Sequence, residues 1–146
     1  FKRVILVDNS CLEELLGNVP IIGFYDKLNE LVVPTMHMVN VLQHSESVMG
    51  NISPPHDISR IVSYGLIDFE TGEEKMFFNL DNVREKVYYY AINEKKLREQ
   101  GDLLKRVIAQ VKANAENTKT TYGIYPTQYE QDYVYCVAYS SIVQEK

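Results

Sequence analysis

The residues of this sequence that could recognise a ligand are tyrosines, which crowd toward its C-terminal end. The stretch TTYGIYPTQYEQDYVYCVAYSSIV, residues 120–143, holds six of the eleven tyrosines, and no tryptophan occurs anywhere. Each tyrosine offers a flat apolar face and a polar hydroxyl, so such a set suits a core wall, a protein interface or a pocket for a flat ligand.

Alternation along residues 133–142 indicates how these rings are arranged. On an extended strand, Tyr133, Tyr135, Val137, Tyr139 and Ser141 share one face, and small apolar residues share the other. The small apolar face suits packing against a long helix, so we expect the tyrosine face to look away from that helix. Cross-strand pairing on a half-exposed sheet, a dimer surface and a concave wall for an aromatic or cationic small molecule all fit this face.

We take the concave wall as the main hypothesis, with several tyrosines as its candidate ligand-binding residues. These are Tyr25, Tyr64, Tyr89, Tyr122, Tyr125, Tyr133, Tyr135 and Tyr139.

Other chemistry is weakly represented in the sequence. There is no Gly-rich phosphate loop, no GxSxG and no HExxH motif. The spacing of His37, His44 and His56 does not resemble a metal site, and Cys11 lies near no candidate base. Asp8 follows an apolar run, where a turn or cap role is the usual one. We therefore expect a protein that is more plausibly a binder than an enzyme, with no cofactor and no metal.

Length and charge narrow the function classes further. A chain of 146 residues is one domain, and its net charge of −5 argues against a nucleic-acid surface. No apolar run reaches the roughly 18 residues that a membrane helix needs. Cys11 and Cys136 are far apart and are read as reduced thiols of a cytoplasmic protein. Because the chain opens at Phe1 without a Met, we expect residues 1–146 to be one small-molecule-binding domain excised from a longer chain.

Hydrophobic periodicity predicts an α+β fold with a mainly antiparallel sheet. Strands are predicted over 3–8, 36–43, 58–68, 75–79, 87–92, 121–125 and 133–142. Helices are predicted over 11–16, in the second half of 18–33 (ended by Pro34) and over 94–115, whereas 18–23 fits either a strand or a helix. Gly72 marks a hairpin turn, and Gly101 marks a kink or close contact in the long helix. The order of elements indicates two strand–helix–strand–strand repeats.

Residues 86–146 resemble the C-terminal half of the gyrase-inhibitor-like effector-binding domains found in MerR-type multidrug-resistance regulators. The similarity runs from a Tyr-rich strand ending in an acidic turn (Val87–Glu94) through a helix around Leu103–Ile108. It continues with the Tyr-x-x-Tyr-Pro strand (Tyr122–Pro126) and the closing strand Asp132–Val143. The first half is similar only in element order and in a helix start at Tyr25–Leu28.

This resemblance implies an aromatic-lined ligand cavity between two repeats, with Tyr122 and Tyr125 in its wall. In drug-sensing members, a buried carboxylate within the tyrosine motif receives the positive charge of a lipophilic cation; here Gly123 stands at that position. Losing a charge pair worth about 4 kcal/mol at 4 Å would change the ligand class. Either another carboxylate substitutes, or the ligand is neutral.

The implied function is the effector- or multidrug-binding part of a transcription regulator, holding a lipophilic or aromatic small molecule. The resemblance also allows for a homodimer formed through a DNA-binding segment that this sequence lacks. Two alternatives stay open. One is a protein-interaction module, such as an inhibitor or immunity-type protein, with the tyrosine face as its interface. The other is a hydrolase in which Glu130 or Asp132 polarises a water beside a tyrosine.

Overall fold

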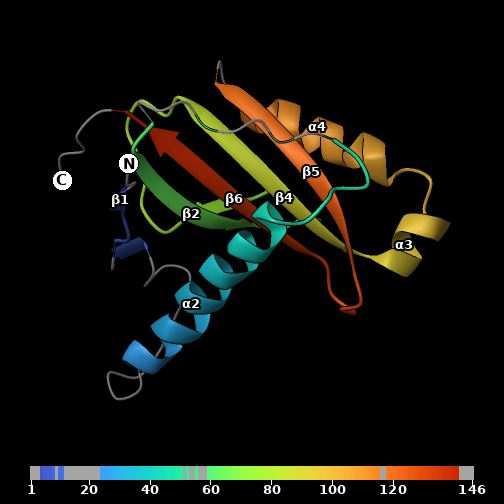
Figure 1. Cartoon of the computed structure of the whole chain (residues 1–146), viewed down its shortest axis with the longest axis horizontal. Helices are drawn as coiled ribbons and strands as arrows, with labels where there is room; N and C mark the ends of the chain where they lie inside the picture. Colours follow the sequence, from blue (N-terminus) through green and yellow to red (C-terminus); the bar gives the residue numbers. More distant parts are fainter. Residues whose placement is uncertain are drawn as a thin grey trace.

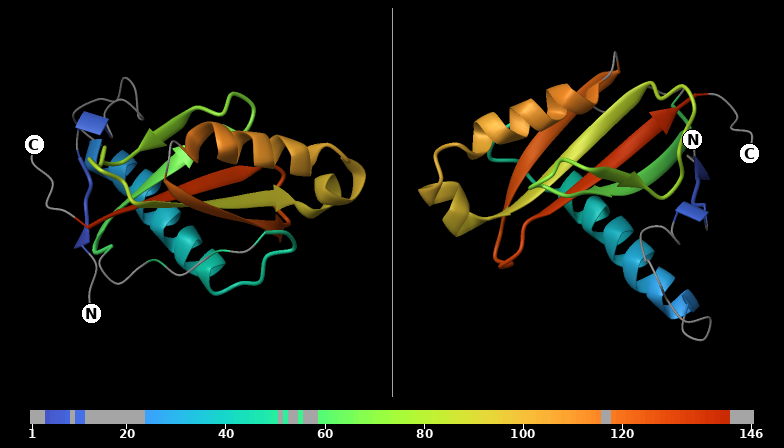
Figure 2. Two further views of the ribbon diagram at one scale, coloured as in Figure 1. Left: turned by 90° about the horizontal axis from the view of Figure 1, so that it is seen from above. Right: turned by 180° about the vertical axis from the view of Figure 1, so that it is seen from behind.

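The computed structural model describes residues 4–8, 10–11, 24–50, 52, 55, 59–115 and 118–141. They form an α+β fold, as the sequence predicts, in which helices lie on both faces of one mixed sheet (Figures 1 and 2). None of the described helices is long and apolar enough to cross a membrane.

In the described part of the chain the sheet has four long strands, and two short strands lie along one edge. Its strands are β1 (Val4–Ile5), β2 (Ile61–Ile67), β3 (Glu74–Met76), β4 (Glu85–Asn93), β5 (Lys119–Thr127) and β6 (Tyr133–Ser140). They are ordered β1-β2-β6-β4-β5, and β3 also pairs with β2. Pairs β2–β6, β4–β6 and β2–β3 are antiparallel, whereas β1–β2 and β4–β5 are parallel.

Helices α3 (Glu94–Glu99) and α4 (Leu103–Ala115) cover one face of the sheet. The core on this face joins Val107 and Val111 of α4 to Val134 and Cys136 of β6. The opposite face carries α2 (Phe24–Gln43), whose far end projects beyond the sheet in Figure 1. Two cores therefore form, one on each side of the same strands.

The prediction that a strand covers 36–43 after a helix stopped by Pro34 is wrong, because α2 runs through both. Thr35, Val39 and Leu42 are buried at helical spacing, with exposed fractions of 4%, 1% and 5%. Pro34 removes one backbone donor inside the helix, a cost of about 3 kcal/mol or more. Burial of Val39 and Leu42 against the sheet offsets that cost.

The prediction of one helix over 94–115 is also wrong in detail, because the chain leaves the helix around Gly101. Helix α3 begins with the Asn93 side chain accepting from Lys95 N–H at 2.9 Å, and the Gln100 N–H closes it onto the Lys96 carbonyl. The break lets α3 lie beyond the end of β4, whereas α4 runs back alongside β5 (Figure 1).

The two-repeat arrangement is not confirmed by the sheet. In the second half β4 lies between β5 and β6, whereas in the first half β1 and β3 both pair with β2 along one edge. The expected helix over 11–16 and the ambiguous segment 18–23 lie outside the described residues, apart from a helical turn at residues 10–11.

The predicted hairpin after β2 is confirmed and leads to a first test. Gly72 in its turn has φ +75°, and Asp68 accepts the N–H groups of Glu70 and Thr71. Beside it, a Cβ added to Gly65 would lie 2.6 Å from the Lys75 carbonyl oxygen and 2.9 Å from the Met76 Cα. Strand β3 approaches β2 closely because position 65 has no side chain.

We therefore expect Gly65→Ala to destabilise the fold by about 1–3 kcal/mol, since β3 must move away. Gly101→Ala is the matched control, because a Cβ there meets nothing within 4 Å. That substitution should stabilise by up to about 1 kcal/mol by restricting the unfolded chain. Urea denaturation followed by circular dichroism measures both, and equal effects would contradict the close approach of β3.

Candidate functional site

The predicted tyrosine face exists and lies under α2. Tyr64, Tyr89, Tyr125, Tyr135 and Tyr139 belong to one core cluster with Val39 and Leu42, and Tyr133 follows on the same side of β6. The prediction that this face looks away from the helix over 94–115 is confirmed, because Val134 and Cys136 pack beneath α4 instead.

Two of the candidate tyrosines lie elsewhere. Tyr122 packs against the other core, because residues three apart on a strand point to opposite faces. Tyr122 and Tyr125 therefore cannot line the same cavity wall, although the resemblance implied that they do. Tyr25 lies in α2, and its side chain is outside the described part of the structure.

The rings under α2 are core residues. Tyr89, Tyr125, Tyr135 and Tyr139 are 1%, 5%, 5% and 4% exposed, and the rings of Tyr89 and Tyr125 lie 6.0 Å apart. Burial raises the pKa of Tyr135 to about 12 and that of Tyr89 further, so these hydroxyls stay neutral. Most of the candidate set thus packs into the sheet's interior.

Gly123 shows why the expected charge-reading position is lost. A Cβ added there would lie 3.0 Å from the ring and hydroxyl of Tyr125 and 3.2 Å from Ile52 Cδ1. The ring of Tyr125 occupies the space into which the side-chain carboxylate of a glutamate at position 123 would have to project. The glycine is explained by this packing rather than by a change of ligand.

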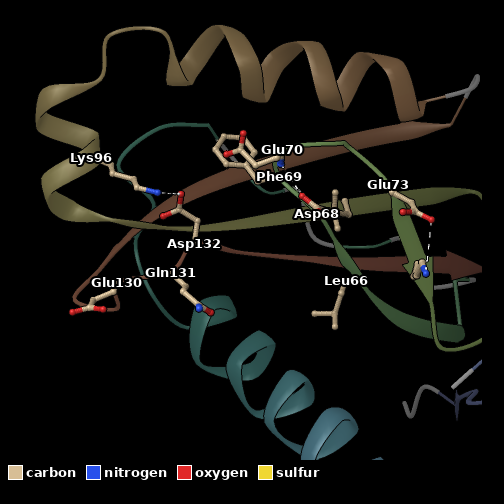
Figure 3. Close-up of a pocket in the computed structure, with 11 residues that line it drawn as sticks. Leu66, Asp68, Phe69, Glu70, Glu73, Lys96, Glu130, Gln131 and Asp132 are labelled. Carbon is tan, nitrogen blue, oxygen red and sulfur yellow. Dashed lines mark hydrogen bonds and ion pairs between the residues drawn. The ribbon is translucent and has the colours of Figure 1, made fainter. Parts of the chain in front are cut away.

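An open groove of about 640 Å³ lies instead between the β2–β3 turn and the β5–β6 loop (Figure 3). Its lining comes from these two segments, the end of β2, β3 and α3. The lining residues are Leu66, Ile67, Asp68, Phe69, Glu70, Glu73, Lys75, Lys96, Glu130, Gln131 and Asp132.

Helix α4 holds the β2–β3 turn, which forms one wall of the groove. The Arg106 guanidinium lies 4.5 Å from the centre of the Phe69 ring and 3.3 Å from a carboxylate oxygen of Glu70. Gln110 donates to the Phe69 carbonyl and accepts from the Tyr90 hydroxyl at 3.1 Å. These contacts tie the turn to both the helix and the central strand.

Asp132 holds the β5–β6 loop, which forms the opposite wall. Its side chain is 9% exposed and accepts from Asn93 N–H at 3.2 Å and from Lys96 Nζ at 2.8 Å. The Asn93 side chain in turn donates to the Tyr129 carbonyl at 2.6 Å. Both oxygens of Asp132 are engaged in fixing the loop, which disfavours its predicted role in polarising a water.

The groove is acidic. It is lined by five carboxylates and two lysines, and pairs join Glu70 to Arg106, Glu73 to Lys75 and Asp132 to Lys96. Among the described residues no cationic partner is found for Asp68 or Glu130, both of which are exposed. The groove therefore carries uncompensated negative charge.

A second charged cluster lies on the α4 side and fits a structural role. The Glu74 carboxylate accepts hydrogen bonds from the Tyr88 hydroxyl at 3.2 Å and from the Cys136 thiol at 3.5 Å, and it lies 3.4 Å from Lys86 Nζ. Burial first, and then Glu74, raise the pKa of Cys136 well above its ordinary value. This thiol stays protonated and inaccessible, so the cluster serves to anchor β3 to the sheet.

The described residues hold no cluster of histidine, cysteine and carboxylate groups that could bind a metal, and His56 lies outside them.

The outer side of α2 is the other notable surface. Val33 and Val41 are 59% and 42% exposed, with exposed His37 midway between them at helical spacing. Val48 and Met49 follow α2 and are 59% and 46% exposed. Met49 forms a β-bridge with Ile124 of β5, and the Val48 N–H donates to the Ile124 carbonyl at 2.8 Å. The sequence prediction missed this stripe because it assigned 36–43 to a strand; the spacing of Val33, His37 and Val41 is its only sequence signal.

Comparison with known proteins places the fold. No family model and no curated protein sequence matches the chain. Among solved structures it is similar to an empty dimer of FtsZ from M. jannaschii, with 12% identity and a TM-score of 0.66 over 93% of this chain and 44% of FtsZ. A point mutant of the same FtsZ gives a TM-score of 0.66 at 12% identity, covering 93% and 46%. GDP-bound monomeric CetZ1 from Haloferax volcanii gives 0.56 at 13% identity, covering 97% and 46%. The chain thus spans less than half the length of these proteins.

These findings overturn the gyrase-inhibitor-like resemblance. The structural neighbours are FtsZ and CetZ, so the expected MerR-type transcription regulator, its multidrug-binding function and its lipophilic or aromatic small-molecule partner are all wrong. The physical reason lies in the tyrosines, whose rings fill the core under α2. The alternative of an inhibitor or immunity-type module is not favoured by the neighbours either.

Proposed function

We propose that this chain is an assembly domain of a larger FtsZ-like protein and that it acts by associating with a second copy of itself through the outer side of α2. One observation carries the proposal: the exposed apolar stripe of Val33 and Val41 on a helix whose opposite side is packed into the core.

Local structure does not explain that stripe. Valine is a weaker helix former than alanine, leucine or lysine, so its use at two exposed helical positions has no propensity benefit. Burying each valine in an interface would gain about 1.5–3 kcal/mol. Scattered exposed apolar residues are common, but two on one side of a projecting helix indicate a contact surface.

The fold likeness supports the choice of partner. One of the similar structures is an FtsZ dimer, and the match extends over 93% of this chain.

The acidic groove described above does not suit a nucleotide. CetZ1 is GDP-bound, but a diphosphate needs backbone donors and cations, whereas the groove described above has an excess of carboxylates. The sequence also lacks a Gly-rich phosphate loop.

The first test is the oligomeric state. Analytical ultracentrifugation over a concentration series should show reversible association, and Val41→Asp should raise the dissociation constant at least about tenfold, because a charge replaces a buried apolar contact. Val7→Asp is the matched control, since Val7 is 41% exposed but lies beside β1. A monomer at every concentration, or equal effects of the two variants, would refute the proposal.

A further inference from the structure

We propose that the acidic groove, together with the exposed rings of Tyr129 and Tyr133 beside it, is a docking surface for an extended, arginine-bearing segment of a partner protein.

The aromatic part of this surface continues outward from the buried tyrosine face. Tyr135 is buried and stacks on Tyr133 at 6.3 Å with an interplanar angle of 14°, and Tyr133 meets Tyr129 edge-on at 6.0 Å. Tyr133 and Tyr129 are 38% and 52% exposed. The ladder therefore presents two partly exposed rings to solvent beside a buried one, as interface tyrosines do.

The ladder and the groove are contiguous. Glu130, Gln131 and Asp132 line the groove and lie between the two exposed tyrosines in the chain, and the Tyr133 hydroxyl donates to Gln131 at 3.4 Å. On the other side, Leu66 lines the groove and pairs in register with Tyr135. One occupant can contact the rings and the groove together.

Charge decides the chemistry of that occupant. Asp68 on the β2–β3 turn and Glu130 on the β5–β6 loop are the two lining carboxylates without a cation among the described residues. A cationic segment would meet a complementary field, whereas phosphate groups of nucleic acids or anionic lipids would be repelled.

Arginine fits better than lysine because two kinds of group must be met at once. A guanidinium is planar, stacks on aromatic faces and pairs with carboxylates through fixed donors, whereas an ammonium acts as a point charge. The same fold already combines these contacts once, where Arg106 lies over Phe69 and reaches Glu70.

Rigid walls make docking at this groove favourable. Arg106 and Gln110 fix one wall, and Asp132 fixes the other through Asn93 and Lys96. A partner segment therefore does not have to order these loops on binding, which lowers the entropic cost. The surface lies on different elements from the α2 stripe, so it can exist whether or not the chain self-associates.

Fluorescence anisotropy with a short labelled peptide in which arginine alternates with glycine tests this inference on the full chain. We expect measurable binding, weaker binding of the lysine version and none of a glutamate version. Glu130→Gln and Asp68→Asn should each weaken binding about twofold to fivefold. The second substitution keeps the side-chain oxygen that caps the turn, so the fold of the turn is retained. Tyr133→Leu should weaken binding about threefold or more by removing the ring face.

The control is Glu46→Gln, which makes the same charge change at an exposed residue that does not line the groove. If Glu46→Gln weakens binding as much as Glu130→Gln, the attraction is general and the docking surface is refuted. If the arginine and lysine peptides bound with equal affinity and Tyr133→Leu left binding unchanged, the role of the rings would be overturned. No binding tighter than about 1 mM would overturn the inference as a whole.

Discussion

Above pH 10 the folded protein should lose stability steeply. Burial raises the pKa values of Tyr88, Tyr89 and Tyr90, and that of Tyr135 to about 12. In the unfolded chain these hydroxyls ionise near pH 10. Between pH 10 and 12 the unfolded state therefore binds fewer protons than the native state, and unfolding is favoured by about 1.4 kcal/mol per pH unit for each such tyrosine.

The sign follows from the direction of the shifts. Because the native pKa values are raised, the stability that these groups contribute is complete below pH 10 and is lost as pH rises toward the native values. Several such tyrosines together suffice to exhaust the stability of about 5–15 kcal/mol that is usual for a domain. We expect alkaline unfolding by about pH 12, with phenolate absorbance appearing in the same transition as the loss of circular dichroism.

Urea midpoints measured at a series of pH values give the slope directly. Tyr135→Phe keeps the ring and removes one ionisable hydroxyl, so it should lower the slope above pH 10 by about 1.4 kcal/mol per pH unit. An unchanged slope in that variant, or wild-type stability that stays constant to pH 12, would show that these hydroxyls reach solvent in the native state.

The second half of the fold was predictable because its strands are long and read as continuous apolar runs or as alternating stretches. Strands β4, β5 and β6 overlap the predicted ranges, and the split of β6 into a tyrosine face and a small apolar face is confirmed. Residues on a central strand that packs on both sides must satisfy two cores at once, which is a strong constraint on sequence. That constraint leaves a pattern that can be recognised from the sequence alone.

The prediction for the first half of the fold failed where local sequence signals compete with tertiary packing. Residues 36–43 alternate over a window too short to separate a strand from a helix, and Pro34 favoured a break. Residues 36–43 form a helix because Val39 and Leu42 then pack against the sheet. The sheet residues that they contact lie far along the chain. The missed helix also concealed the apolar stripe on its outer side.

The groove could not have been predicted for a different reason. Its walls, the β2–β3 turn and the β5–β6 loop, are separated by about sixty residues and meet because Ile67 pairs with Val134. Single carboxylates in turns are ordinary turn residues when seen in sequence alone. Their common field arises only from the register of β2 against β6.

Truncating a buried tyrosine should lower the stability of the fold far more than truncating an exposed one. Tyr89→Ala should cost about 3–5 kcal/mol of unfolding free energy, the range for large aromatic residues in a packed core. Tyr89 is 1% exposed, lies opposite Tyr135 across the strands and contacts the Tyr125 ring. Tyr133→Ala should cost less than about 1 kcal/mol, because that ring is 38% exposed and lies at the rim.

Urea denaturation with linear extrapolation measures both substitutions under the same conditions. The comparison is matched, because the same side chain is removed from the same sheet face at two depths. If Tyr89→Ala cost no more than Tyr133→Ala, the inner ring would have to border an unfilled space rather than packed side chains. A large difference instead means that the inner tyrosines hold α2 on the sheet and only the outer two are available to a partner. Under that outcome the same residue type serves the core at one end of β6 and recognition at the other.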